Sequence, residues 1–165
     1  MELNAQRNNY MRGKRAKKRP IEVDPIYKSK IVTRMINVVM QGGKKTIAQD
    51  IVYTAMGNLA EDRKEAAKMF EDAVKNVMPA QEVRSRRVGG ATYQVPIPLR
   101  HDRAEALAIR WIVGAVRKKK GKPTSDRLFE ELKSAHEGIG DAMRKREETH
   151  RMAEANRAFA HFARY

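Results

Sequence analysis

Apolar residues recur every three to four positions over much of the chain, which is the spacing of amphipathic helices. The first such stretch covers residues 31–40 and is followed by Gly42-Gly43. Because glycine adopts the left-handed conformation of a helix C-terminus without strain, this helix is expected to end there. Its apolar stripe holds Ile31, Val32, Met35, Ile36, Val39 and Met40.

Two more helices are predicted before the pattern changes. One starts beside Lys44-Lys45, and the other runs from about residue 63 to residue 78 and stops at Pro79, since proline disrupts a helix interior. The inward faces are expected to hold Ile47, Ile51, Ala55 and Leu59 in the earlier helix, and Ala66, Phe70, Val74 and Val77 in the later one.

The helical period gives way to alternation between residues 81 and 98. Two alternating runs flank Gly89-Gly90, and this pattern predicts an antiparallel hairpin over residues 81–98. Pro96 and Pro98 are expected to end its second strand. Because a lone two-stranded hairpin is only marginally stable in water, its tip is expected to project and to be fixed by another surface.

The fourth and fifth predicted helices follow the hairpin. The fourth is apolar nearly all round, so a central position is expected. Asp102 and Glu105 have the spacing of a capping pair at its start. The fifth begins after Pro123, with Thr124 or Ser125 as its cap. Burial is expected for Trp111 in the fourth helix and for Leu128, Leu132, Ala135 and Ile139 in the fifth.

The sixth predicted helix is strongly charged over residues 144–151 and ends with Phe159 and Phe162 at helical spacing. These two rings are predicted to pack inside the protein rather than to stack on bases. Together the elements predict a mainly α fold over residues 21–165. It is a single domain resembling a six-helix bundle, with a two-stranded hairpin projecting between the third and fourth helices.

The charge of the chain points to a polyanionic partner. Thirty-five Lys and Arg residues against 20 Asp and Glu leave a net charge of +15, and such an excess destabilises a compact state through repulsion. Residues 1–20 carry +6 of it, without apolar periodicity. This stretch is predicted to be a basic arm, disordered when free. Its densest part contains Arg12, Lys14, Arg15, Lys17, Lys18 and Arg19.

Composition limits both the cellular compartments and the classes of partner that are compatible with this chain. No stretch approaches the roughly 20 apolar residues of a spanning helix, so nucleic acid is favoured over a membrane. The first twenty residues lack the apolar run of a secretory signal and the Ser and Thr typical of a transit peptide. The chain has no cysteine, which excludes disulfides and thiolate metal sites and favours the cytoplasm.

Candidate chemistry along the chain favours binding rather than catalysis. Gly43-Lys44-Lys45-Thr46 superficially resembles a phosphate loop, but Val38 stands where the motif needs glycine and Lys45 where it needs Ser or Thr. A helix N-terminus beside two lysines is instead expected to hold a backbone phosphate. The four histidines have neither metal-ligand nor catalytic spacing, so no catalytic residue, metal or cofactor is expected.

Two further groups of cations are candidate phosphate contacts. Arg84 and Arg86 share one face of the predicted hairpin, and Arg87 lies on the other. Guanidinium groups suit bidentate contact with phosphate and stacking on bases. Residues 117–120 (Arg-Lys-Lys-Lys) end the fourth helix, where one or two cations would be enough to stabilise its dipole. Four cations indicate phosphate contact as well.

The hairpin sequence from Glu82 to Pro96, EVRSRRVGGATYQVP, resembles the hairpin motif of the small ribosomal subunit protein seven family, bacterial type. The segments RWIV at residues 110–113 and RMAEANRAFAH at residues 151–161, with the turn at residues 43–45, are also similar to that family. The resemblance covers roughly residues 11–165. The order of three helices, a hairpin and three helices is similar to the family fold.

This resemblance implies a primary binder of small-subunit rRNA, in its three-prime major domain, that nucleates assembly of the subunit head. Expected partners are that rRNA, the exit-site tRNA and small-subunit proteins nine and eleven. The expected rRNA-binding residues are Arg12, Lys14, Arg15, Lys17, Lys18, Arg19, Lys44, Lys45, Arg84, Arg86, Arg87, Arg110, Arg117, Lys118, Lys119 and Lys120. The residues expected near the tRNA are Val88, Gly89, Gly90, Arg144, Lys145, Arg146 and Arg151.

The chain departs from the family pattern in two places, and its composition alone would also fit a different function. Residues 1–10 precede the usual family start, so either Met11 is the natural start or the prefix is lineage-specific. Thr92 replaces a frequent Asn, and either side chain can bond to turn backbone. A nucleic-acid-packaging protein would have the same composition but not the hairpin motif. An RNA-processing enzyme would need a carboxylate cluster or histidine pair that the sequence does not display.

Overall fold

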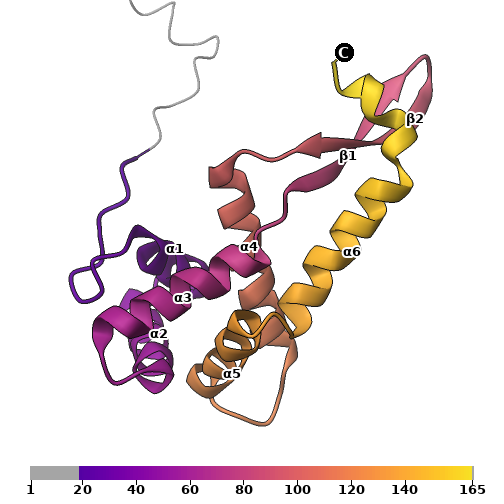
Figure 1. Ribbon diagram of the computed structural model, residues 1–165. Helices are drawn as coiled ribbons and strands as arrows, with labels where there is room; N and C mark the ends of the chain where they lie inside the picture. Colours follow the sequence, from indigo (N-terminus) through magenta and orange to yellow (C-terminus); the bar gives the residue numbers. More distant parts are fainter. Residues whose placement is uncertain (1–18, 165) are drawn as a thin grey trace, which may run out of the picture.

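The computed structural model describes residues 19–164. The predicted mainly α fold, with a hairpin between the third and fourth helices, is confirmed, and a short 3-10 helix follows the sixth (Figure 1). In chain order the elements are α1 Lys30–Val39, α2 Lys45–Leu59, α3 Arg63–Val77, β1 Gln81–Val88, β2 Ala91–Pro98, α4 His101–Lys118, α5 Thr124–His136, α6 Asp141–Ala155 and η2 Arg157–Arg164. No helix in this part of the chain is long and apolar enough to cross a bilayer.

Helix α4 lies at the centre of the helical body, as its apolar sequence predicted. It contacts α1, α3, α5 and α6, and the core residues Ala108, Ile109, Ile112, Val113 and Val116 all come from it. The body occupies one end of the molecule, and the hairpin, α6 and η2 extend from it together (Figure 1). Trp111 is half-buried against the core rather than inside it.

The expected core positions of α3 are confirmed, as is that of Ala55 in α2, but the expected burial of Ile47 and Ile139 is wrong. In α2 the buried residues are Ala48, Val52, Ala55 and Met56, whereas Ile47 is 53% exposed. Ile51 and Leu59 are half-buried against the core, and the small side chain of Ala48 is buried in place of that of Ile47. Ile139 is 59% exposed because α5 has already ended at His136 and the chain has turned at Gly138.

Both predicted N-terminal caps are also corrected by the structure. Helix α4 begins at His101, and Glu105 does not cap it. Instead, the Glu105 carboxylate is 4% exposed and lies 2.6 Å from the Arg34 guanidinium of α1. This charge-assisted contact offsets the burial of the Glu105 carboxylate. Helix α5 begins at Thr124 itself, after Pro123, with no side-chain cap.

The hairpin follows the predicted boundaries. Gly89 and Gly90, with φ of 57° and 90°, form its turn. Positive φ at both central residues is typical of a type I′ turn, whose backbone twist matches the twist of the two strands that it joins. Strand β2 ends at Pro98, as expected, and Pro96 and Pro98 still pair with Val83 and Gln81 in the ladder. Strand β2 is an edge strand, where a missing amide is tolerated.

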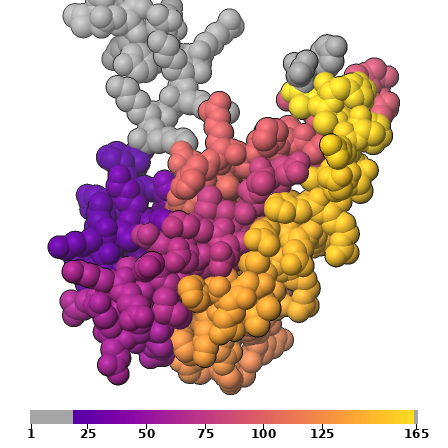
Figure 2. All heavy atoms as spheres, viewed as in Figure 1, coloured from indigo at the N-terminus to yellow at the C-terminus, as the bar shows by residue number. Residues whose placement is uncertain are grey.

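Aromatic packing holds the hairpin against the C-terminal segment. The Tyr93 ring of β2 lies 5.3 Å from the Phe159 ring and 5.0 Å from the Phe162 ring, centroid to centroid. The predicted packing role of these two phenylalanines is therefore confirmed. Figure 2 shows the C-terminal segment in yellow against the hairpin at the end of the projection. The surface that fixes the projecting hairpin is thus supplied in part by the chain itself.

Asp24 anchors the segment before α1. Its side chain accepts hydrogen bonds from the backbone amides of Ile26 and Tyr27 at 3.1 and 2.9 Å, and from the Tyr53 hydroxyl of α2 at 2.7 Å. Burial of the phenol, together with its bond to the Asp24 carboxylate, raises the pKa of Tyr53 to about 12. The segment that leads from the basic arm is therefore tied to the helical body.

This contact predicts a loss of stability at alkaline pH. The folded state favours the protonated phenol, so the contribution is fully present below pH 10 and is lost as the pH rises to about 12. We expect the free energy of unfolding, measured with urea, to fall over this interval in the unmodified protein. The Tyr53→Phe variant should be less stable at neutral pH but should show a smaller fall. An equal fall in both proteins would show that Tyr53 is not responsible.

Candidate nucleic-acid interface

The turn between α1 and α2 presents Lys44 and Lys45 to solvent. Gly42 and Gly43 have φ of 58° and 75°, so both need the left-handed backbone that glycine permits. The Lys44 amide donates to the Gln41 carbonyl at 3.1 Å, which closes the turn. Lys44 becomes the N-cap residue of α2 and Lys45 its first residue, and both are exposed. Two cations thus stand at the positive end of a helix dipole.

The four cations at the end of α4 have different environments. Arg117 donates to the carbonyls of Val38 and Val39 at 3.0 and 3.5 Å and so satisfies the end of α1. Lys119 pairs at 2.6 Å with the fully buried carboxylate of Glu131. Lys118 and Lys120 are exposed. In the predicted basic cluster, Arg117 and Lys119 therefore bond to other elements, and three of the four residues, Arg117, Lys118 and Lys120, are exposed.

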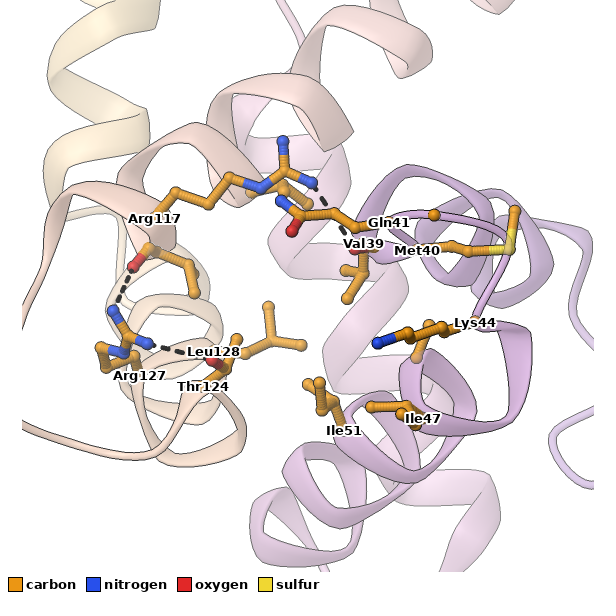
Figure 3. A pocket seen from close by; sticks show the side chains of 14 residues that line it. Val39, Met40, Gln41, Lys44, Ile47, Ile51, Arg117, Thr124, Arg127 and Leu128 are labelled. Atoms are coloured by element: carbon orange, nitrogen blue, oxygen red, sulfur yellow. Dashed lines mark hydrogen bonds between the residues drawn. The ribbon is translucent and has the colours of Figure 1, made fainter.

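A cleft of about 520 Å³ lies between these two cationic segments. Its walls come from the end of α1, the start of α2, the end of α4 and the start of α5 (Figure 3). Lys44 extends into it from one side, and Arg117 lies across from it. The floor is apolar, with contributions from Ile47, Ile51 and Leu128. The fold thus brings together two cations that the sequence placed in separate candidate sites.

Arg127, which the sequence-based assignment missed, lines the same cleft. Its guanidinium donates to the carbonyl oxygens of Val116 and Lys119 at the end of α4 and to the Thr124 hydroxyl. A signal for this role is present in the sequence, since Arg127 lies in the first turn of α5, where a cation opposes the helix dipole. Because an arginine is unfavourable beside the positive end of its own helix, a hydrogen-bond acceptor from another element is expected beside it.

The base of the hairpin is organised by Glu82, a second residue that sequence reasoning missed. The Glu82 carboxylate lies 2.9 Å from the Arg84 side chain and 3.2 Å from that of Arg103 on α4. Glu82 is buried, so it joins the hairpin to the helical body while partly neutralising Arg84. Arg87 on the other face is exposed, and Arg86 is half-buried beside its ladder partner Tyr93.

The cations of α6 also differ in their contacts. Arg144 lies 3.5 Å from Asp141, and Lys145 lies 2.6 Å from Glu148, whose carboxyl pKa it lowers through their hydrogen bond. Arg146 donates to the Asn76 carbonyl and thereby docks α6 on the end of α3. Arg151 is exposed. The expected proximity of these residues to tRNA stays a prediction.

Comparison with known proteins identifies the family. A family model described as ribosomal protein S7p/S5e matches residues 11–157. The chain belongs to this family. It is 54% identical over 153 residues to "Small ribosomal subunit protein uS7" of Thermotoga neapolitana and of Thermotoga maritima, an overlap that covers 92% of this chain and 99% of each relative. The protein of the same name from Pelotomaculum thermopropionicum is 51% identical over 146 residues, or 88% of this chain and 94% of the relative.

The resemblance drawn from the hairpin motif is thereby confirmed, and the chain is a ribosomal protein of the S7p/S5e family. Within the matched range, the motif from Glu82 to Pro96 forms most of β1, the glycine turn and most of β2. Candidate cations gather on three surfaces: the cleft beside Lys44, the hairpin, and a groove between α4 and α6. That groove has a volume of about 410 Å³ and is lined by Trp111, by the cations Arg110, Lys118, Arg144 and Lys145, and by the carboxylates of Asp141 and Glu148.

The remaining predicted contacts of this family member belong to the arm. Arg19 is exposed at the start of the described chain. Five others, Arg12, Lys14, Arg15, Lys17 and Lys18, lie outside the described residues. Over residues 19–164, no three His, Asp or Glu side chains are grouped as metal ligands would be. The hairpin tip, at Val88, Gly89 and Gly90, lies far along the projection from the helical body (Figure 1).

Proposed function

We propose that this chain is a structural constituent of the small ribosomal subunit and that it acts by binding rRNA, without turnover. The observation that carries the proposal is the family match over residues 11–157, together with the names of the similar proteins. The exposed cations on the cleft, the hairpin and α6 support it, because phosphate neutralisation releases counterions from RNA. Binding by these surfaces is expected to weaken by about 0.7–0.9 log units per log unit of salt for each phosphate contacted.

More specific roles follow from the family resemblance. We propose that the rRNA site lies in the three-prime major domain and that binding nucleates assembly of the subunit head in the cytoplasm. The hairpin tip and α6 would face the exit-site tRNA, and small-subunit proteins nine and eleven would be neighbours. Specificity would come from RNA shape and unpaired bases, since side chains cannot enter the deep groove of A-form helices.

The test is competition binding to a transcript of the three-prime major domain of small-subunit rRNA. The assay would contain excess duplex DNA and bulk tRNA at physiological salt. Retained tight binding is the expected result, because a folded surface that recognises RNA shape is not displaced by charge alone. Displacement by either competitor would instead favour a general packaging protein and would overturn the proposed rRNA specificity.

The hairpin arginines provide a residue-level prediction. The Arg84→Glu/Arg86→Glu double variant is expected to weaken binding to the same transcript by about tenfold to a hundredfold. Its thermal unfolding midpoint should fall only modestly, because the buried Glu82 carboxylate that Arg84 contacts keeps Arg103 as a second cation. Lys64→Glu/Lys68→Glu, on the mixed-charge face of α3, is the control with the same change in net charge. A large fall in the unfolding midpoint of the hairpin variant would mean that these arginines are structural.

A further inference from the structure

The cleft beside Lys44 has an apolar floor that the fold leaves open to solvent. Ile47 is 53% exposed and lines the cleft together with the half-buried Met40 and Ile51. Burial of such surface is favourable by about 25 cal/mol per Å². A ligand with an apolar face would therefore gain from entering here, and the volume of about 520 Å³ lies in the range of small-molecule sites.

The walls of the cleft carry only positive charge. Lys44, Arg117 and Arg127 line it, and none of its lining residues is acidic. Arg127 is fixed by its bonds to the carbonyls at the end of α4. Arg117 uses one nitrogen, Nη2, for the end of α1, which leaves donors of its guanidinium available to a ligand. Lys44 has no ion-pair partner within residues 19–164, and its side chain extends toward the middle of the cleft (Figure 3).

We propose that this cleft receives one unpaired nucleotide of the bound RNA. Its base would pack on Ile47 and Ile51, and its phosphate would lie between Lys44 and Arg117. The inference deepens the proposed rRNA-binding function and rests on it. An apolar protein side chain would fill the floor but leave the cations without an anion, whereas a nucleotide supplies both a flat apolar face and a phosphate. Unpaired nucleotides are the parts of RNA whose bases proteins can bind individually.

The test compares two exposed isoleucines. Ile47→Ala removes part of the proposed contact with the base, and Ile139→Ala removes a similarly exposed side chain, 59% accessible, that does not line the cleft. With the three-prime-domain transcript, Ile47→Ala is expected to bind about tenfold more weakly, with an unchanged salt slope. Ile139→Ala should bind as the unmodified protein does. Unfolding midpoints are measured for both variants to confirm that they are folded.

Chemical probing of unpaired bases in the same complexes gives a second readout. The unmodified protein is expected to protect a base that becomes reactive again with Ile47→Ala. Lys44→Gln should expose the same base and lower the salt slope by about 0.7–0.9. Unchanged affinity and an unchanged reactivity pattern for Ile47→Ala would overturn the inference while leaving rRNA binding intact. Failure of the unmodified protein to bind the transcript would overturn the proposed function, and the inference with it.

Discussion

Replacing the six cations of residues 12–19 by glutamine is expected to weaken rRNA binding by about a hundredfold or more at physiological salt. These cations are Arg12, Lys14, Arg15, Lys17, Lys18 and Arg19. Each contributes through the counterions that it releases from the RNA, so the slope of log affinity against log salt should also become shallower by several units. Filter binding at a series of salt concentrations measures both quantities, and glutamine keeps the length of the arm unchanged.

The comparison that tests this prediction is a change at the hairpin tip. Val88→Ser with Gly89→Asn removes the apolar residue and keeps a turn sequence compatible with positive φ. This variant should retain most of the rRNA affinity, since it removes no charge. If the tip variant and the glutamine variant lose equal affinity, the concentration of charge in the arm does not determine binding.

The hairpin is a part of the fold that the local sequence is sufficient to predict. Alternation on both sides of Gly89-Gly90 is sufficient to set the register, because a two-residue turn places Val88 opposite Ala91 and every other pair follows. The central position of α4 was predictable for a similar reason, since a helix that is apolar nearly all round has no face suited to solvent. These features depend on neighbours along the chain, which a sequence displays directly.

Contacts between distant segments were not predictable in this way. Arg117 belongs to a basic run that helix-dipole stabilisation and phosphate binding both explain, yet it completes the end of α1, 79 residues away. Glu105 had the spacing of a cap but pairs with Arg34 on another helix. In both cases the partner lies on another helix, and local spacing does not show which groups the tertiary fold brings together.

The cleft illustrates the same limit for the candidate site. Lys44 and the run from Arg117 to Lys120 were each predicted to contact phosphate, but nothing in their spacing indicated that they would share a cavity. The fold brings them together because Arg117 caps α1 immediately before the turn that carries Lys44. The contact joins one wall of the cleft to the other, so Arg117 has both a structural and a proposed ligand-binding role.

Glu131 joins three helices through one buried carboxylate. Its side chain is fully buried in α5, and Oε2 lies 2.6 Å from the Lys119 ammonium at the end of α4. Oε1 accepts a hydrogen bond at 3.0 Å from the Ala142 amide in the first turn of α6. The approach is close, since a Cβ at Gly140 would lie 3.2 Å from Oε1. A carboxylate at a helix N-terminus is also favoured by the helix dipole.

Glu131→Ala is expected to lower the free energy of unfolding by about 3 kcal/mol, near the lower end of the range for breaking a buried ion pair because Lys119 remains partly exposed. At about 2–4 °C per kcal/mol for a protein of this size, the unfolding midpoint should fall by roughly 10 °C. Glu131→Gln keeps a carbonyl to accept from Ala142 and should lose less. Glu130→Ala, which removes the exposed pair with Lys122, is the control and should change the midpoint little. Calorimetry measures the unfolding midpoints of the three variants. Similar falls in the midpoint for Glu130→Ala and Glu131→Ala would mean that the buried carboxylate does not hold α4, α5 and α6 together.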